Sequence, residues 1–366
     1  MTTESTTWVM VTRRGSDARA TIADVAREAG VNKGTVSRAL RGHAGVGNST
    51  RARIFAVADR LEFSASHTAT ALATGMSKTV GIVLPTLSSW YFSEVAAAAS
   101  GVLIAAGFRV ELINLDTESE MLDVTSVAFR QLFRELGAGR GRDALLFAGT
   151  IAIETGTPDT RFAKVPASLA GLPLTSVPGI FVDNHRGGRL VGEHLIQLGH
   201  RRIAVLDGRP AGLGTGAMWQ RRTDGLLEAL RSAGVSPEST QILGLGDCRA
   251  EDGAEAMETL LRTSEHTPTA VFCHCDQMAF GALSVLRRRG LRCPEDISIA
   301  AFDDHPMSKF WGLTTVTQHA RQQGTRSAAA LLAAMGAADP QAALETAPEA
   351  LDVQLLVRET TGPVSG

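Results

Sequence analysis

The chain has 366 residues, of which 44% are hydrophobic and 20% charged, and its formal net charge is −2. These values are typical of a globular protein with room for a small domain and a larger two-lobed body, and they argue against a disordered chain. No apolar run approaches the roughly 20 residues of a membrane span, so no membrane contact is expected.

The charge is unevenly distributed. Residues 1–78 contain 11 Lys and Arg against six Asp and Glu, whereas the remainder contains 25 against 32. A basic head on an acidic body is typical of a DNA-binding protein. The four cysteines form no disulfide framework, and the Thr-rich start has no signal-peptide core. A cytoplasmic location is therefore predicted.

The first ordered segment predicts two short helices. Thr21 can cap a helix with apolar residues at helical spacing, and Gly30 supplies a left-handed stop. Asn32 can cap a second helix that carries Val36 and Leu40 on its inner face, and a third helix follows Ser49. Two short helices joined by a tight turn containing Gly are typical of a helix-turn-helix.

The outer face of the second helix has the chemistry of DNA recognition. The N-terminal end of a recognition helix meets base edges, and an Arg there can bind guanine O6 and N7. We predict DNA contacts from this set: Thr21, Lys33, Gly34, Thr35, Ser37 and Arg38. The alternative is an ordinary surface helical hairpin with solvated charges.

These residues resemble the lactose-repressor (LacI/GalR) family of bacterial transcription regulators. The matching positions are Ile22, Asp24, Val25, Ala26, Ala29, Gly30, Val31, Thr35, Val36, Ser37, Arg38, Leu40, Thr50, Arg51 and Leu61. The resemblance implies that Lys33, Gly34 and Arg38 occupy the specificity positions.

A hinge is expected after the head. Family members read roughly Y-x-P-N-x-x-A-R-x-L, and this chain reads FSASHTATAL over residues 63–72. Ala65 and Ser66 replace the Pro-Asn pair and Thr70 replaces the Arg, while Leu72 matches. The resemblance implies that Leu72 wedges into the minor groove. The alternative is that it is a plain core residue.

From Val80 onward, strand patterns alternate with helix patterns, which predicts doubly wound parallel sheets. The first series has strands at 80–85, 109–115 and 144–149 and helices at 91–106 and 120–136. The second series starts near Gly179, with strands at 180–183, 202–208, 241–246, 269–273 and 297–302. Its helices cover 187–198, 221–233, 254–261 and 278–289. Residues 150–178 give no clear pattern.

The resemblance to the family continues in 187–208, 276–291, 294–304, 313–318 and 357–361. It implies a fold like the periplasmic sugar-binding proteins, with two lobes, three crossovers and a ligand in the cleft. The expected organisation is a flexible extension (1–18), a helix-turn-helix domain (19–63), a hinge (64–78) and an effector-binding and dimerisation domain (79–366). Lobe one would comprise about 79–178 plus 317–345, and lobe two about 179–316 plus 350–361.

Ligands of open α/β sheets bind beyond the carboxyl ends of the strands. That rule and the resemblance together select these effector contacts: Tyr91, Phe92, Asp183, Arg222, Cys275, Asp276, Asp303 and Gln318. Carboxylates, one Arg and aromatic faces suit a sugar, whose paired hydroxyls form two hydrogen bonds to one such group. Cys275 stands where relatives often have Asn, so a purine, nucleoside or other effector stays open.

Some of these residues have structural alternatives. Asp183 could cap a helix, and Asp276 could cap a helix or pair between subunits. Asp304, which ends the same strand as Asp303, is a further candidate contact that could equally be a helix cap.

Enzyme signatures are missing. The GLGTG run at 212–216 lacks the spacing of a dinucleotide loop, and no nucleophile–base pair is recognisable. Cys273 and His274 would face opposite sides of a strand, with no second Cys or His pair nearby. We therefore expect no catalysis, no metal and no cofactor. A periplasmic sugar-binding protein would share the body but needs a signal peptide and no DNA-binding head.

The combined prediction is a homodimeric repressor of carbohydrate-utilisation genes that reads a near-palindromic double-stranded operator. Effector binding would change the spacing of the hinges and shift a two-state population. The resemblance favours release from DNA by ligand, although some relatives need a corepressor.

Overall fold

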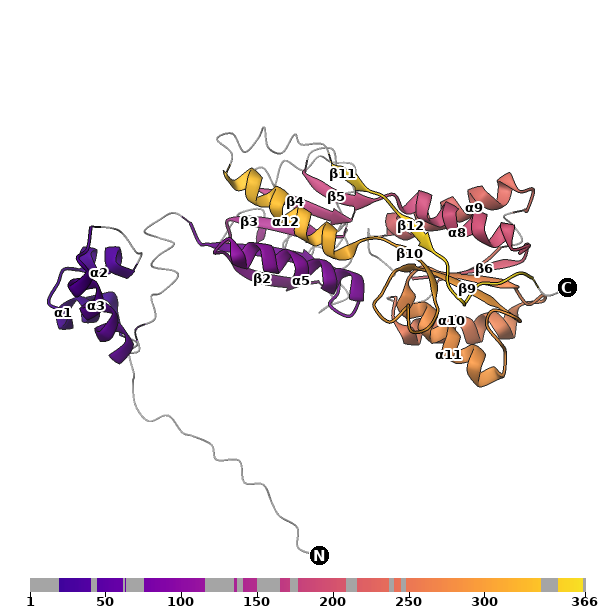
Figure 1. Cartoon of the computed structure of the whole chain (residues 1–366), viewed down its shortest axis with the longest axis horizontal. Coiled ribbons are helices and arrows are strands. Elements are labelled where there is room, and N and C mark those ends of the chain that lie inside the picture. The colour runs from indigo at the N-terminus through magenta and orange to yellow at the C-terminus, as the bar shows by residue number, and fades with distance from the viewer. Residues whose placement is uncertain are drawn as a thin grey trace, which may run out of the picture. The chain divides into compact units, whose positions relative to one another are not determined.

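The computed structural model describes residues 20–40, 45–61, 63, 76–115, 135–136, 141–149, 165–171, 177–208, 216–236, 240–244, 248–336 and 348–364 (Figure 1). Contacts divide the chain into two units, Met1–Ser77 and Lys78–Gly366. The expected extension at 1–18, the hinge residues Ala65, Ser66, Thr70 and Leu72, and nearly all of the expected helix 120–136 lie outside the described residues.

The head unit contains three helices, α1 (Ile22–Glu28), α2 (Lys33–Leu40) and α3 (Asn48–Arg60), as predicted. Thr21 caps α1: its backbone N–H donates to Asp24 Oδ2 at 2.9 Å, and its hydroxyl accepts from Asp24 N. Asn32 Oδ1 accepts from the backbone N of Thr35 at 2.7 Å and so caps α2. Val25, Val36 and Ile54 are fully buried between the helices.

Lobe one is a parallel sheet with strand order β11-β5-β4-β3-β1-β2. Its strands are β1 (Thr79–Leu84), β2 (Arg109–Asn114), β3 (Ala144–Ala148), β4 (Ala167–Gly171), β5 (Gly179–Val182) and β11 (Glu349–Leu351). Helices α5 (Trp90–Ala105) and α12 (Ala320–Gly336) pack side by side against it (Figure 1).

Lobe two has the strand order β12-β10-β9-β8-β6-β7, parallel except where β12 pairs with β10. Its strands are β6 (Ile203–Asp207), β7 (Gln241–Gly244), β8 (Ala270–Cys273), β9 (Ser298–Asp303), β10 (Thr314–Thr317) and β12 (Gln354–Leu356). Its helices are α8 (Asn184–Gln197), α9 (Gly216–Ser232), α10 (Ala250–Thr263) and α11 (Asp276–Arg289).

Alternation along the strands of lobe two gives each helix pair its own core. Leu206 packs in the cluster that contains Met257 of α10 and Met278 of α11. Its neighbour Val205 packs with Leu195 of α8 and Leu226 of α9. Because successive strand residues point to opposite faces, the pairs α8–α9 and α10–α11 cover opposite sides of the sheet.

The assignment of residues 179–182 to lobe two is wrong. They form β5, which pairs with β4 and β11 in the sheet of lobe one. The strand–helix pattern is the same on both sides of this point, so it cannot tell which sheet a strand joins. The chain instead crosses at the start of α8, again between β10 and α12, and finally between β11 and β12. Strand β4, within the stretch that gave no clear pattern, was missed.

The close contact between α10 and α11 requires a glycine at position 281. A Cβ at Gly281 would overlap the backbone oxygen of Ala250. We expect Gly281→Ala to lower the free energy of unfolding by about 1–3 kcal/mol or more, the usual cost of overpacking. In α5, by contrast, a Cβ at Gly101 would have no neighbouring atom within 4 Å. Gly101→Ala should therefore raise stability by about 0.5–1 kcal/mol. Urea unfolding measures both, and equal effects would contradict the packing account.

Candidate functional site

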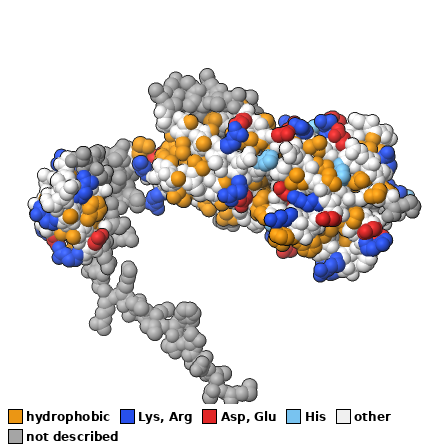
Figure 2. All heavy atoms as spheres, in the orientation of Figure 1, with side chains coloured by type: hydrophobic (Ala, Val, Ile, Leu, Met, Phe, Trp, Pro, Cys, Tyr) orange, Lys and Arg blue, Asp and Glu red, His pale blue; other side chains and the backbone are white. Residues whose placement is uncertain are grey.

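The head presents the outer face of α2 to solvent. Lys33, Gly34 and Arg38 are exposed, and Thr35 and Ser37 are partly exposed. Among the described residues, the Arg38 guanidinium donates to its own helix, to Gly34 O at 3.3 Å and to Thr35 Oγ1 at 3.5 Å. Figure 2 shows further basic side chains on the visible face of this unit. The two hydrogen bonds of Arg38 are long, so they hold its guanidinium only weakly and leave it able to bind another acceptor.

The second site is a pocket between the lobes, with about 250 Å³ of empty space. Its lining includes six of the eight predicted effector contacts, namely Tyr91, Phe92, Arg222, Cys275, Asp303 and Gln318. Four further residues complete it: Ser89, Met218, Trp219 and Cys248. Asp183 and Asp276 are not among the lining residues.

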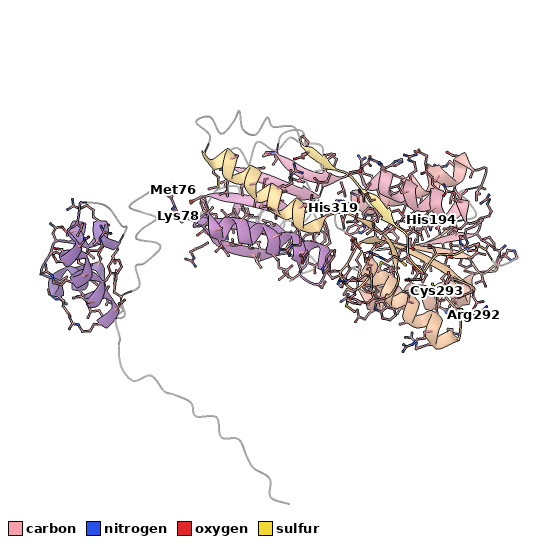
Figure 3. The ribbon with its side chains drawn as sticks, in the orientation of Figure 1. Met76, Lys78, His194, Arg292, Cys293 and His319 are labelled. Atoms are coloured by element: carbon pink, nitrogen blue, oxygen red, sulfur yellow. The ribbon has the colours of Figure 1, made fainter. Side chains whose placement is uncertain are left out.

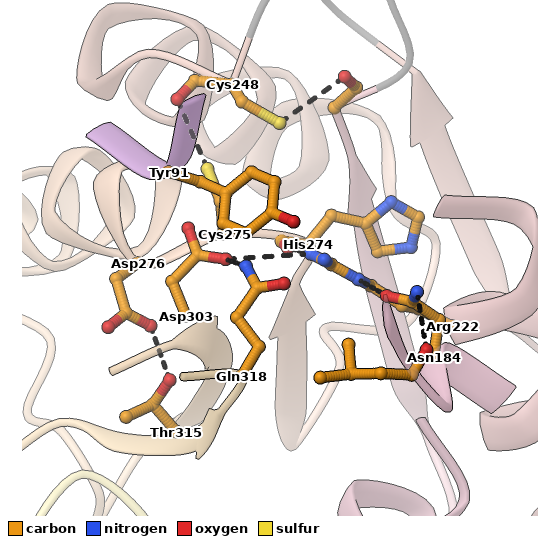
Figure 4. A network of polar contacts seen from close by, with 12 residues as sticks. Tyr91, Asn184, Arg222, Cys248, His274, Cys275, Asp276, Asp303, Thr315 and Gln318 are labelled. Carbon is orange, nitrogen blue, oxygen red and sulfur yellow. Dashed lines mark hydrogen bonds and ion pairs between the residues drawn. The ribbon is translucent and has the colours of Figure 1, made fainter. Parts of the chain in front are cut away.

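Arg222 forms the polar floor of the pocket and is 2% exposed (Figure 4). Its Nε donates to Asn184 Oδ1 at 2.9 Å, and Nη1 donates to the backbone oxygen of His274. Nη1 also lies 3.8 Å from Asp303 Oδ1, and the guanidinium stacks 3.7 Å from the centroid of the Phe302 ring. Burial lowers the pKa of Arg222, and the charge of Asp303 opposes that shift.

Asp303 ends β9 with a backbone φ of 132°, a conformation that residues other than glycine rarely adopt. Burial raises the pKa of this carboxyl well above its usual value, against the opposing effect of Arg222. Gln318 donates through Nε2 to Asp303 Oδ1. Its other polar atom, Oε1, is buried without a hydrogen-bond partner among the described residues. A buried acceptor of this kind is open to a donor on a ligand.

One wall of the pocket is aromatic. Tyr91 and Phe92 lie in the first turn of α5, with ring centroids 5.2 Å apart in an edge contact. The Tyr91 hydroxyl donates to Gln323 Oε1 at 2.8 Å, which fixes the ring. Trp219 adds a third aromatic side chain from α9.

Another part of the lining contains sulfur. Cys275 caps α11, because its Sγ accepts from the backbone N of Met278 at 3.5 Å. The same thiol donates to the backbone oxygen of Cys248 at 3.2 Å. Burial raises the pKa of Cys275 well above its usual value, so the thiol is neutral at physiological pH. This part of the lining is therefore uncharged and polarisable.

Two predicted effector contacts have other partners. Asp183 is exposed and caps α8, accepting from the backbone N of Arg186 at 3.0 Å. Asp276 is fully buried and accepts from His305 N at 2.7 Å and from the Ser308 and Thr315 hydroxyls at 2.5 Å. The cap of α11 belongs to its neighbour Cys275.

Sequence reasoning missed four lining residues, and two signals could have found three of them. Met218 and Trp219 precede Arg222 by four and three positions in α9, so they share its helix face. Cys248 follows the carboxyl end of β7, where the rule for open sheets places ligand contacts. Ser89 had no such signal.

Within the described residues, no group of three or more His, Cys, Asp or Glu side chains is arranged to hold a metal ion. None of the helices described is both long and apolar enough to cross a membrane.

Known proteins combine a head and a two-lobed body of this kind. A family model for bacterial regulatory proteins, lacI family, matches residues 21–66, and one for a periplasmic binding protein-like domain matches residues 193–361. The HTH-type transcriptional repressor PurR of Mannheimia succiniciproducens is 30% identical over 312 residues, which cover 84% of this chain and 90% of the relative.

Solved structures agree in fold. The lac repressor dimer bound to operator and the anti-inducer ONPF has a TM-score of 0.77 and 28% identity, over 94% of this chain and 99% of that one. A CelR–cellobiose complex has a TM-score of 0.61 and 26% identity, over 93% and 100%. A ribose-bound regulator from Enterococcus faecium has a TM-score of 0.65 and 26% identity, over 78% and 100%.

The buried Asp276 predicts a pH dependence of stability. Burial raises its pKa from 3.8 to about 7, although three hydrogen bonds oppose the shift. The folded protein thus binds this proton more tightly than the unfolded chain. The free energy of unfolding therefore falls as the pH rises from 3.8, the value of the unfolded chain, to about 7, the value of the folded protein. The slope is at most about 1.4 kcal/mol per pH unit for one proton.

We expect Asp276→Asn to flatten the decline in unfolding free energy between pH 5 and pH 7, measured by urea unfolding at each pH. The control is Asp296→Asn, because Arg292 lowers the pKa of Asp296 and its titration lies below the window. The same slope in Asp276→Asn and the unmodified protein would contradict the assignment.

Proposed function

We propose that this chain, which belongs to the lacI family of bacterial regulatory proteins, is a DNA-binding repressor whose operator affinity is set by a small sugar-like effector. The observation that carries the proposal is the convergence of Arg222, Asp303 and Gln318 in one pocket between the lobes. A charged donor, a carboxyl and an open amide oxygen can bind adjacent hydroxyl groups. The proposed target is carbohydrate-utilisation genes.

Solved structures of similar proteins favour a sugar. The ribose-bound and cellobiose-bound relatives provide precedent for sugars.

A purine is the second candidate. The aromatic and sulfur-containing side chains in the lining suit the flat faces of a base. The 30%-identical relative is a PurR repressor, which supports the same alternative. A purine would leave the architecture unchanged and alter only the class of effector.

We propose that the protein acts as a homodimer on a near-palindromic operator, as the lac repressor dimer is bound to its operator. One exposed loop between β9 and β10 carries three large apolar side chains: Met307 is 45% exposed, Phe310 72% and Trp311 43%. Large exposed apolar side chains gathered on one loop are a feature of protein interfaces. Insertion of Leu72 into the minor groove, as the resemblance implies, belongs to the same proposal.

The effector site can be tested by thermal unfolding with ribose, cellobiose, other sugars, hypoxanthine and guanine. A compound at 100 times its dissociation constant should add about 2.7 kcal/mol of stability. Asp303→Asn and Arg222→Lys should each weaken binding of that compound by about 30-fold or more. Asp303→Asn removes one charge of the buried pair, and Arg222→Lys replaces the forked guanidinium with a single ammonium group. Both variants should still bind operator.

Asp183→Asn is the matched control, because Asp183 is exposed and outside the pocket lining. It should bind the compound as the unmodified protein does; a loss would restore Asp183 as an effector contact. Unchanged binding in both pocket variants would reject the site, and a purine hit without a sugar hit would select the second candidate.

The DNA contacts can be tested on operators selected from random DNA. Arg38→Ala should lower affinity for the selected site by about tenfold or more, the worth of one good base contact. Arg60→Ala removes the same charge from α3, where the Arg pairs with Glu28. It should change specific binding much less, and equal losses in the two variants would indicate general electrostatics instead of base recognition.

The interface can be tested by sedimentation. Phe310→Asp should shift the protein from dimer to monomer, because a carboxylate would be buried in an apolar contact. Ile242→Asp places the same charge at a 43% exposed residue on β7, an edge strand separated from β9 by β6 and β8. A dimer that tolerates both changes would place the interface elsewhere.

A further inference from the structure

We propose that His274 is a positioning residue for Arg222, so that it sets effector affinity without lining the pocket. The inference rests on the proposed function, in which Arg222 binds the effector. His274 directly follows β8, and its side chain is completely buried. It belongs to neither the pocket lining nor any described group of potential metal ligands.

Among the contacts of His274, three relate it to Arg222 and to the neighbouring strand. Its Nδ1 lies 3.0 Å from Oδ1 of Asp207, the last residue of β6. Its Nε2 shares a hydrogen bond of 2.9 Å with the hydroxyl of Thr223 in α9. Its backbone oxygen accepts from Nη1 of Arg222, as Figure 4 shows.

The ring therefore joins the ends of two neighbouring strands to the helix that carries Arg222. β6 and β8 are paired, with Leu206 opposite Cys273, so Asp207 and His274 extend adjacent strands. Thr223 is the next residue after Arg222. The His274 side chain thus contacts the turn of α9 from which the guanidinium projects, and the backbone oxygen of the same residue accepts a hydrogen bond from that guanidinium.

Loss of this anchor would leave the guanidinium with weaker constraints. Asn184 and the Phe302 ring would still hold it, while the nearest carboxylate oxygen of Asp303 is 3.8 Å away. A ligand that needs two hydrogen bonds from Arg222 gains affinity when the fork is held in the bound orientation beforehand. Removal of His274 should therefore raise the entropy cost of binding.

His200 provides a matched control in the same lobe. It is 1% exposed, and its ring atoms contact Thr269 Oγ1 and Gly362 O, both at 3.0 Å. Neither partner lines the pocket. His200→Ala and His274→Ala both remove a buried imidazole, and both should lower stability. Only His274→Ala should change how firmly the Arg222 guanidinium is held.

The first measurement needs no ligand. The Nε–H resonance of Arg222 is identified by its loss in Arg222→Lys, and its exchange with solvent is measured in the full-length protein. We expect exchange to be about tenfold faster in His274→Ala and unchanged in His200→Ala. It should be partly restored in His274→Gln, because an amide can replace the hydrogen bond to the Thr223 hydroxyl. The same exchange rate in His274→Ala and the unmodified protein would overturn the proposal.

The second measurement uses whichever sugar or purine raises the melting temperature of the unmodified protein. His274→Ala should bind it about tenfold more weakly, whereas His200→Ala should bind it normally. If no compound binds, the proposed effector class has failed, and the exchange measurement still decides the role of His274. If His274→Ala does not fold, Thr223→Val removes the hydroxyl contact with little change of shape. A normal Arg222 exchange rate in Thr223→Val would then overturn the proposal.

Discussion

The burial of one guanidinium charge organises the effector domain. Transfer of a charge from water into a protein interior is costly unless polar partners replace the lost hydration. Arg222 receives such partners from four places: Asn184 in α8, the backbone of His274 after β8, Asp303 at the end of β9 and the face of Phe302. The polar floor of the pocket therefore exists only when these elements are packed together.

Close helix packing makes that arrangement possible. A Cβ at Gly188 in α8 would overlap the carbonyl oxygen of Arg222, and a Cβ at Gly225 in α9 would overlap that of His185. The two glycines let the helices approach until Asn184 meets the guanidinium. On the other side of the sheet, Gly253 and Gly281 do the same for α10 and α11. Positions that carry no side chain thus determine where the functional side chains lie.

Much of this could be predicted from the sequence, because periodicity and strand ends are local signals. They located the head helices, both α/β lobes, Arg222 and Asp303, and the family resemblance added Gln318. They failed where the outcome depends on distant partners. Residues 179–182 have the same strand pattern in either lobe, and only pairing with β4 decides. Asp183 and Asp276 both follow strands, but one points to solvent and caps a helix, while the other is enclosed by Ser308, Thr315 and the backbone of His305.

The pocket is also the place where a ligand can act on both lobes together. Tyr91 of lobe one donates to Gln323 of α12, which donates to the backbone of Gln318, which in turn donates to Asp303 of lobe two. Gln318 lies in a crossover, and the next residue, His319, lies between the lobes with a φ of 53° (Figure 3). A ligand that donates to the open Oε1 of Gln318 would therefore bind to the segment that joins them. If the bound ligand changes the preferred geometry of this crossover, the balance between the arrangements of the two lobes changes as well. A ligand-controlled switch requires that the ligand bind those arrangements with different affinities.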